Sequence, residues 1–136
     1  MRGSGALVLV VVCLSVAGCG GISSPSSNTV DTFKDTLAVG GSKIHAFSAS
    51  KTGEILVKVT ELTPSSQNAL VGLTWAQAGS DGGCTTTIGG VIQQTFAQLN
   101  VQAIGGQILK GSYCLIVQDV GTFTVPEAYT ITVSHP

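Results

Sequence analysis

The sequence predicts a single all-β domain from Thr29 onward, a β-sandwich or closed barrel of about seven to nine short antiparallel strands. Three observations support this prediction. Val, Thr and Ile are prominent and often alternate with polar residues, clusters of Gly or of Pro and Ser interrupt them at short intervals, and no stretch has sustained helical periodicity. We identify no second domain and no repeat in this part of the sequence.

The strand pattern varies in clarity along the chain. Glu54–Leu62 alternates apolar and polar residues, and Ala69–Gln77 is apolar on both faces, which is typical of a central strand. Residues 91–104 are ambiguous, since their Gln and Ala content permits a helix, but alternating apolar residues favour a strand over 96–104. The expected strands are 31–37, 43–49, 54–62, 69–77, 96–104, 112–120 and 127–134, with the short segment 84–88 between two Gly-rich turns.

Residues 1–18 predict a secretory signal peptide. Arg2 is the only charged residue among the first 30, and the apolar run Ala6–Ala17 behind it is too short to span a membrane unaided. A buried N-terminal strand is the alternative interpretation, and the wholly aliphatic character of the run disfavours it.

The end of this segment, Val16-Ala17-Gly18-Cys19, resembles the lipobox of bacterial lipoproteins. The resemblance implies that Cys19 receives a diacylglycerol and becomes the first mature residue, with 19–28 forming the lipidated Cys and a flexible linker. Gly20 in place of Asp implies sorting to the outer membrane if the host has two membranes. Ordinary cleavage after Ala17, with free secretion of the chain, is the alternative.

The cysteine count fits an oxidising compartment. Cys13 leaves with the signal peptide and Cys19 would be lipidated, so Cys84 and Cys114 remain to form a disulfide with no thiol left over. Two buried free thiols are one alternative. A metal pair is another, although no His lies near either residue in the sequence.

The composition argues against several classes of function. Only 10% of residues are charged and the formal net charge is -1, so no strong field exists to attract a nucleic acid. Two His and few carboxylates offer little material for a metal site or an acid–base pair, and no nucleophile, zinc or phosphate-loop motif is present. We therefore expect no catalytic activity, no metal and no cofactor.

Few individual side chains suggest a binding site. His45 lies in an expected strand, where a structural role is the ordinary interpretation. Asp81 and Asp119 are interpreted as turn residues, with ligand binding a weaker alternative for Asp119. Phe96 and Phe123 are the aromatic residues most expected to be exposed, so Phe96, Phe123 and Asp119 are weak candidates for ligand binding.

The run Asp31–Leu62 resembles the opening of bacterial pre-peptidase C-terminal (PPC)-like domains, in which a strand and a Gly-rich turn lead to a second strand and then to Gly-x-[Val/Leu]-x-Val. Three later segments fit as well: Lys110–Cys114, Val117–Gly121 and Tyr129–Val133. The resemblance covers nearly all of residues 29–136. It implies a jelly-roll-like β-sandwich without catalytic residues, found beside secreted peptidases or alone on surface proteins. Similar collagenase modules use calcium, but the linker 20–28 has no carboxylate, which removes the main reason to expect it here.

These observations predict a non-catalytic lipoprotein, anchored to the cell envelope, that acts as a binding or accessory module for a neutral polysaccharide or a protein. One alternative is a structural or assembly subunit of the envelope that pairs through a sheet edge. Another is a freely secreted PPC-like accessory domain. A cluster of exposed aromatic residues would favour binding, whereas a long unprotected edge strand would favour assembly.

Lipidation is tested by labelling with palmitate. The label is expected to enter the wild-type chain but not the Cys19→Ala variant, because the lipobox implies that this thiol is the acceptor. Equal labelling of the two chains, or no label in either, would contradict lipidation at Cys19.

Overall fold

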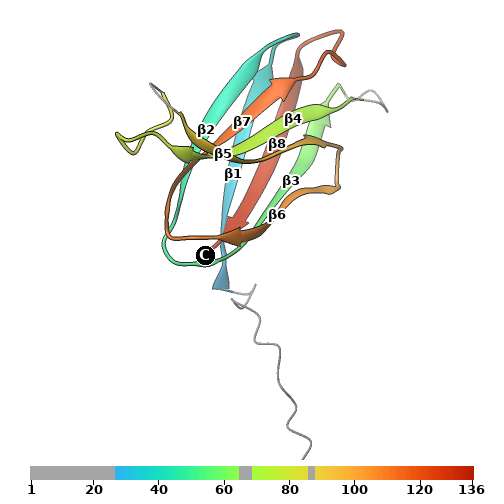
Figure 1. Ribbon diagram of the computed structural model, residues 1–136. Coiled ribbons are helices and arrows are strands. Elements are labelled where there is room, and N and C mark those ends of the chain that lie inside the picture. Colours follow the sequence, from blue (N-terminus) through green and yellow to red (C-terminus); the bar gives the residue numbers. More distant parts are fainter. Residues whose placement is uncertain (1–26, 65–68, 86–87) are drawn as a thin grey trace, which may run out of the picture.

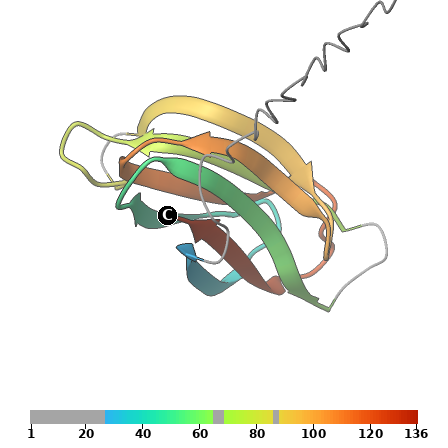
Figure 2. The ribbon, with the colours of Figure 1, turned by 90° about the horizontal axis from the view of Figure 1, so that it is seen from below.

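Two four-stranded antiparallel sheets pack face to face in a computed structural model of the chain (Figure 1 and Figure 2). The structure describes residues 27–64, 69–85 and 88–136, so the predicted signal peptide and most of the predicted linker lie outside the described residues. Within the described ranges, no helix is long and apolar enough to cross a membrane.

The sandwich consists of eight strands: β1 (Thr29–Leu37), β2 (Ser42–Ala49), β3 (Gly53–Thr63), β4 (Val71–Ala78), β5 (Ile88–Ala97), β6 (Gln102–Ile108), β7 (Gly111–Asp119) and β8 (Glu127–His135). Sheet I has the order β1-β8-β3-β6, and sheet II has the order β2-β7-β4-β5. This is the strand order of an eight-stranded jelly roll. The predicted all-β, jelly-roll-like sandwich is confirmed.

The core lies between the sheets and is formed by alternate residues of the central strands. Ile55, Val57 and Val59 of β3 are fully buried, as are Leu115 and Val117 of β7 in the opposite sheet. Because side chains alternate between the two faces of a strand, the neighbours of these residues point outward. In the alternating pattern that predicted a strand over 54–62, the apolar residues therefore lie on the inner face of sheet I and the polar residues on its outer face.

The region between the disulfide cysteines differs from the sequence prediction. The preference for strand over helix in this region is confirmed, but the single strand expected over 96–104 is wrong, because residues 98–101 form a turn that separates the end of β5 from the start of β6. Asn100, at the tip of this turn, has a positive φ of 63°, and its amide donates a hydrogen bond of 2.8 Å to the carbonyl of Val59. The alternation that favoured a strand spans only a few residues, which is too short to separate a strand from a tight turn.

The Gly pair at 89–90 was expected to interrupt the chain, but it lies within β5. A Cβ atom on Gly89 would lie 2.8 Å from the carbonyl oxygen of Ala78, so this position requires a residue without a side chain. Gly89 therefore permits β4 and β5 to approach each other closely, and it does not end a strand. Cys84 and Thr85 precede β5 as irregular structure, so of the described residues in the segment 84–88 only Ile88 belongs to a strand.

Candidate functional site

The outer surface of sheet II carries side chains that the register arranges in rows across the four strands. Ile44 of β2 lies opposite Ile116 of β7, which in turn lies opposite Thr74 of β4. We call these rows the neutral face: Ser42, Gln118, Gly72 and Phe96; Ile44, Ile116, Thr74 and Gln94; Ala46, Cys114, Ala76 and Val91. All of these residues are described in the structure, and none of them is charged.

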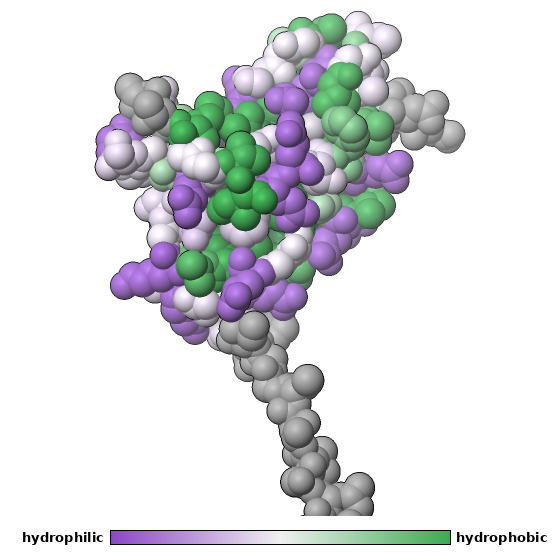
Figure 3. Space-filling view, in the orientation of Figure 1, coloured by the Kyte–Doolittle hydropathy of each residue, from purple (hydrophilic) through white to green (hydrophobic). Residues whose placement is uncertain are grey.

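Several large apolar side chains on this side of the molecule are open to solvent. Phe96 is 65% exposed, Val91 62% and Ile44 43%. Figure 3 shows hydrophobic residues gathered in a band over the middle of this side. Single exposed apolar residues are ordinary, but their collection on an uncharged surface is typical of a contact site.

The outer surface of sheet I is different. The same alternation places Lys34 of β1 on it, together with Glu54, Lys58 and Glu61 of β3. Thr130 of β8 donates a 2.8 Å hydrogen bond to Glu61 there. The charged groups of the sandwich are therefore distributed unequally between its two outer surfaces.

Strand β5 forms one edge of sheet II and is unusually free of charge. It has no charged residue and no proline, and the sequence has no charged residue anywhere between Asp81 and Lys110. By contrast, the edge strands β1 and β2 direct Asp31, Asp35 and Lys43 toward the gap between the sheets. Inward-pointing charges protect an edge against pairing with another strand, and β5 lacks this protection. Its register with β4 is irregular around Ala76 but continuous from Gly72 to Trp75.

The gap between β1 and β2 is closed by a ladder of polar and aromatic contacts. Lys43 lies 3.1 Å from the carboxylate of Asp35, and the ring of His45 stacks on Phe33 with centroids 4.6 Å apart. His45 Nε2 also lies 2.7 Å from the hydroxyl of Tyr129. Burial lowers the pKa of His45, against the opposing effect of the Asp35 carboxylate, so its ring is neutral at pH 7. These contacts give His45 the structural role expected from the sequence.

The second histidine belongs to the same region. His135 Nε2 lies 2.9 Å from the carboxylate of Asp31, and its ring packs on Phe47. Within residues 27–64, 69–85 and 88–136, no three His, Cys, Asp or Glu side chains gather in a group that could hold a metal ion.

Asp119 organises the loops at the end of the sandwich where β7 leads to β8. Its Oδ1 accepts hydrogen bonds of 2.9–3.2 Å from the amides of Gly121, Thr122 and Phe123, and its Oδ2 accepts one of 2.8 Å from the amide of Gly40. Burial would raise the pKa of Asp119, but these four amide donors together lower it. The turn role expected for Asp119 agrees with this geometry, and both carboxylate oxygens are occupied within the protein.

Phe123 was expected to be exposed, and this expectation is wrong. The side chain is 5% exposed and belongs to the hydrophobic core. The turn held by Asp119 directs the chain so that Phe123 covers the end of the core between the sheets. Phe96 is the only one of the three candidate ligand residues that lies on the neutral face.

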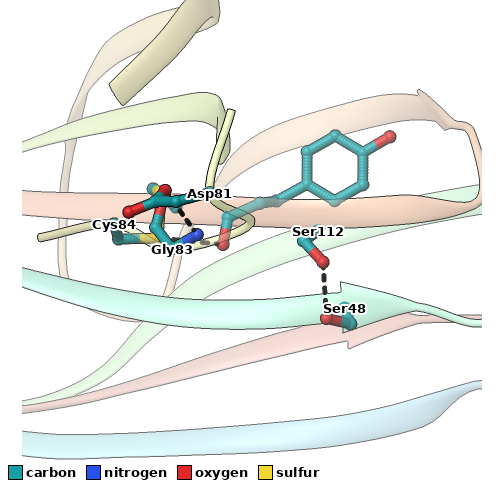
Figure 4. The surroundings of a disulfide bond; sticks show 7 residues. Ser48, Asp81, Gly83, Cys84 and Ser112 are labelled. Carbon is teal, nitrogen blue, oxygen red and sulfur yellow. Dashed lines mark hydrogen bonds between the residues drawn. A yellow bond between two sulfur atoms is a disulfide. The ribbon is translucent and has the colours of Figure 1, made fainter. Parts of the chain in front are cut away.

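Cys84 and Cys114 form the disulfide predicted from the cysteine count, with their Cα atoms 5.7 Å apart. Cys114 lies on the outer side of β7, so the bond holds the loop 79–84 against one end of the neutral face. Within this loop, the Gly83 amide donates a 3.0 Å hydrogen bond to Asp81 (Figure 4). Asp81 is thus a turn residue, as expected.

Val91 and Ile44 were not among the residues expected to form a site. The strand expected over 96–104 contains only the last two residues of β5, so this edge strand was not recognised. Neither Val91 nor Ile44 belongs to a motif. The signal that could have found this surface is the long uncharged stretch between Asp81 and Lys110, which contains all of β5 and β6.

Comparison with protein-family models and with curated proteins gives no match. Among solved structures, the chain is similar to the Yersinia pseudotuberculosis-derived mitogen, with a TM-score of 0.55 and 10% identity, over 80% of this chain and 87% of that one. It also matches PliG, a periplasmic inhibitor of g-type lysozyme from Aeromonas hydrophila, with a TM-score of 0.49 and 11% identity, over 83% of this chain and 93% of that one. The similarity to the mitogen concerns the β fold.

Asp119→Ala is expected to lower the free energy of unfolding by about 2 kcal/mol at pH 7, because four amides lose their acceptor. The lowered pKa means that the ionised carboxylate stabilises the fold above pH 3.8 and that this stabilisation is lost as the pH falls through the folded-state value. Denaturant unfolding at pH 7 and pH 2 should therefore show a smaller difference from wild type at pH 2. Asp119→Asn keeps one acceptor oxygen and should lose less, whereas an Asn variant as unstable as the Ala variant would contradict this assignment.

Glu127→Gln is expected to stabilise the protein by about 1 kcal/mol at pH 7. Glu127 is 3% exposed, one of its carboxylate oxygens has no hydrogen-bond partner, and burial raises its pKa. A raised pKa favours the protonated fold, so stability is lost as the pH rises from 4.5 through the folded-state value. Thermal unfolding should show the gain at pH 7 and little gain near pH 4. The exposed control Glu54→Gln should change little, and an equal gain in this control would refute the explanation.

Proposed function

We propose that this chain is a non-catalytic module of the bacterial cell envelope, anchored by a lipid at Cys19, and that it binds a protein partner. The neutral face and the adjoining edge of β5 would form the contact surface. The observation that carries the proposal is the absence of charge from this surface, on which Phe96, Val91 and Ile44 are exposed.

A protein fits this surface better than a polysaccharide does. Sugar sites generally need flat aromatic side chains that face the solvent. Of the seven aromatic residues, all of which lie in the described part of the chain, Phe96 is the only one classed as exposed. One aromatic ring among aliphatic and amide side chains resembles a protein contact, in which a few apolar anchors supply most of the affinity.

The chemistry of such a contact follows from its composition. Burying Phe96, Val91 and Ile44 removes apolar area from water, and each side chain contributes up to about 1–2 kcal/mol because it is already partly covered. Gln94 and Gln118 supply neutral hydrogen-bonding groups beside them. Without ionised groups at the surface, binding should depend little on salt.

The envelope location is supported by three features. The signal-like run and the lipobox indicate export with an anchor at Cys19, and the Cys84–Cys114 disulfide is typical of an oxidising compartment. The jelly-roll strand order agrees with the fold that the PPC-like resemblance implies. We therefore keep membership of that family, and the absence of catalysis that it implies, as part of the proposal.

The unprotected edge of β5 favours a second candidate, an assembly subunit of the envelope. In this case a strand of the partner would add to sheet II beside β5, and backbone hydrogen bonds would supply much of the affinity. The two candidates differ in what they require of side chains. Binding through the face requires Val91 and Phe96, whereas strand addition depends mainly on the backbone of β5.

The test is a pull-down from detergent-solubilised envelope with the full chain as bait. Wild type is expected to retain a protein at about 0.5 M salt and in the presence of chelator, because no ion pair or metal contributes. Val91→Asp should reduce the retained amount by about tenfold, since an ionised carboxylate would be buried in the contact.

Val39→Asp is the matched control. Val39 is 52% exposed and lies in the turn between β1 and β2, outside the rows of the neutral face. Retention of the same protein by Val39→Asp but not by Val91→Asp supports the proposal. Three outcomes would contradict it: a protein retained equally by both variants, a partner released by salt or chelator, or a retained polysaccharide without protein.

A further inference from the structure

The predicted linker enters the sandwich at a defined end. Asn28 donates hydrogen bonds of 3.3 Å to the carbonyl of Glu54 and to the hydroxyl of Ser134, which ties the start of β1 to β3 and β8. The amide of Ser50 donates to the carbonyl of Pro136 at 2.9 Å. Figure 1 shows the start of β1 beside the C-terminus at the lower end of the sandwich.

Two turns project at this same end. The turn at 50–52 joins β2 to β3, and the turn at Leu109–Lys110 joins β6 to β7. They are neighbours, because Gly53, which follows the first turn, pairs with Ile108, which precedes the second. We call this part of the molecule the entry end.

The turn at Leu109 exposes an apolar side chain between fixed backbone groups. Leu109 is 60% exposed, and its carbonyl accepts a 2.8 Å hydrogen bond from the hydroxyl of the buried Tyr113. Gly111 follows with a φ of 159°, a conformation that favours glycine. The hydrogen bond and the glycine therefore fix the conformation of this turn, while the side chain of Leu109 points away from the core.

Two exposed lysines lie in the same turn as Leu109 or in the neighbouring one. Lys110 is next in the chain and Lys51 lies in the neighbouring turn, and both are exposed. Glu54, Asp81 and Asp31 also lie toward this end, and Asp31 is held by His135, so the inference rests on the placement of Leu109 and the two lysines and not on a net positive charge. Leucine beside lysines is the arrangement of residues that enter a membrane interface, with the apolar side chain inserted and the ammonium groups at the phosphates.

We infer that the entry end rests on the lipid bilayer, with Leu109 inserted among the headgroups and Lys51 and Lys110 beside the lipid phosphates. This inference rests on the proposed anchor at Cys19. Residues 20–28 would then separate the lipid from Asn28, and a chain of this length spans about 15–18 Å on average. Of all the surfaces of the sandwich, the entry end is the one that such a short linker keeps next to the membrane.

The contact would also orient the binding surface. Strand β1 is nine residues long, about 26 Å, and runs from the entry end to the turn that contains Val39. With the entry end on the bilayer, this turn faces away from the membrane. The neutral face and β5 then stand to the side, where an envelope protein can reach them.

Fluorescence quenching tests the inference with the full lipidated chain in vesicles of phosphatidylethanolamine and phosphatidylglycerol that contain brominated acyl chains. Leu109→Trp places a fluorophore at the proposed contact, and Val39→Trp places one at the opposite end. The native Trp75 is 3% exposed and serves as the background. We expect at least twofold quenching of the added fluorophore in Leu109→Trp and none in Val39→Trp.

Lysine labelling of the wild-type chain gives a second measurement that needs no substitution. Lys51 and Lys110 should react severalfold more slowly with an amine reagent on vesicles than in detergent. Lys34 and Lys58, on the outer surface of sheet I, should react equally in both.

The outcomes separate this inference from the proposed function. If the chain floats with the vesicles but position 109 is not quenched, or if both positions are quenched equally, the orientation is wrong and the anchor stands. Equal labelling of all four lysines leads to the same conclusion. A chain that does not float overturns the lipid anchor and this inference together.

Discussion

The sandwich depends on one constraint, the need of each sheet to bury one apolar row of side chains per strand against the other sheet. Ile55, Val57 and Val59 satisfy it in sheet I, and Leu73, Leu115 and Val117 satisfy it in sheet II. Once the inner rows are filled, the outer rows are free to vary, because folding makes little demand on them. Sheet I uses this freedom for lysine and glutamate. Sheet II carries isoleucine, valine and phenylalanine in equivalent positions, which are the positions where solvation alone would favour polar residues.

The two open sides of the sandwich are also closed by different means. Between β1 and β2, one ion pair and one pair of stacked rings join the sheets, with Asp35 beside Lys43 and His45 against Phe33. On the opposite side, the turn between β5 and β6 connects the sheets covalently, and the amide of Asn100 fastens that turn to β3. A turn links the two sheets on both sides, because residues 38–41 join β1 to β2 as residues 98–101 join β5 to β6. The sides differ in their side chains, since β5 and β6 contain no charged residue.

Much of the fold could be predicted from the sequence because alternation is a direct record of burial. It was reliable over 127–134 and 54–62, where it extends over a whole strand. It failed over 96–104, where it extends over a few residues that the structure places in a turn. The disulfide was predicted by counting, since only Cys84 and Cys114 remain to pair once the predicted signal peptide and lipid anchor account for Cys13 and Cys19. The burial of Phe123 could not be predicted from the sequence. It depends on the four amides that donate hydrogen bonds to Asp119, and a local sequence pattern does not reveal these contacts. The neutral face combines residues from four strands, so only the tertiary register reveals it.

The position of the disulfide has a consequence for the compartment in which the protein can work. Cys84 and Cys114 are buried but do not belong to the hydrophobic core cluster, and the core residues of β7 on either side of Cys114 point the other way. Reduction would therefore leave the packing between the sheets in place while it freed the loop 79–84 from the outer side of β7. In a reducing compartment, the border of the neutral face would therefore be the part of the surface most directly altered. Oxidation of the two cysteines would then shape the proposed binding surface separately from the burial that stabilises the fold.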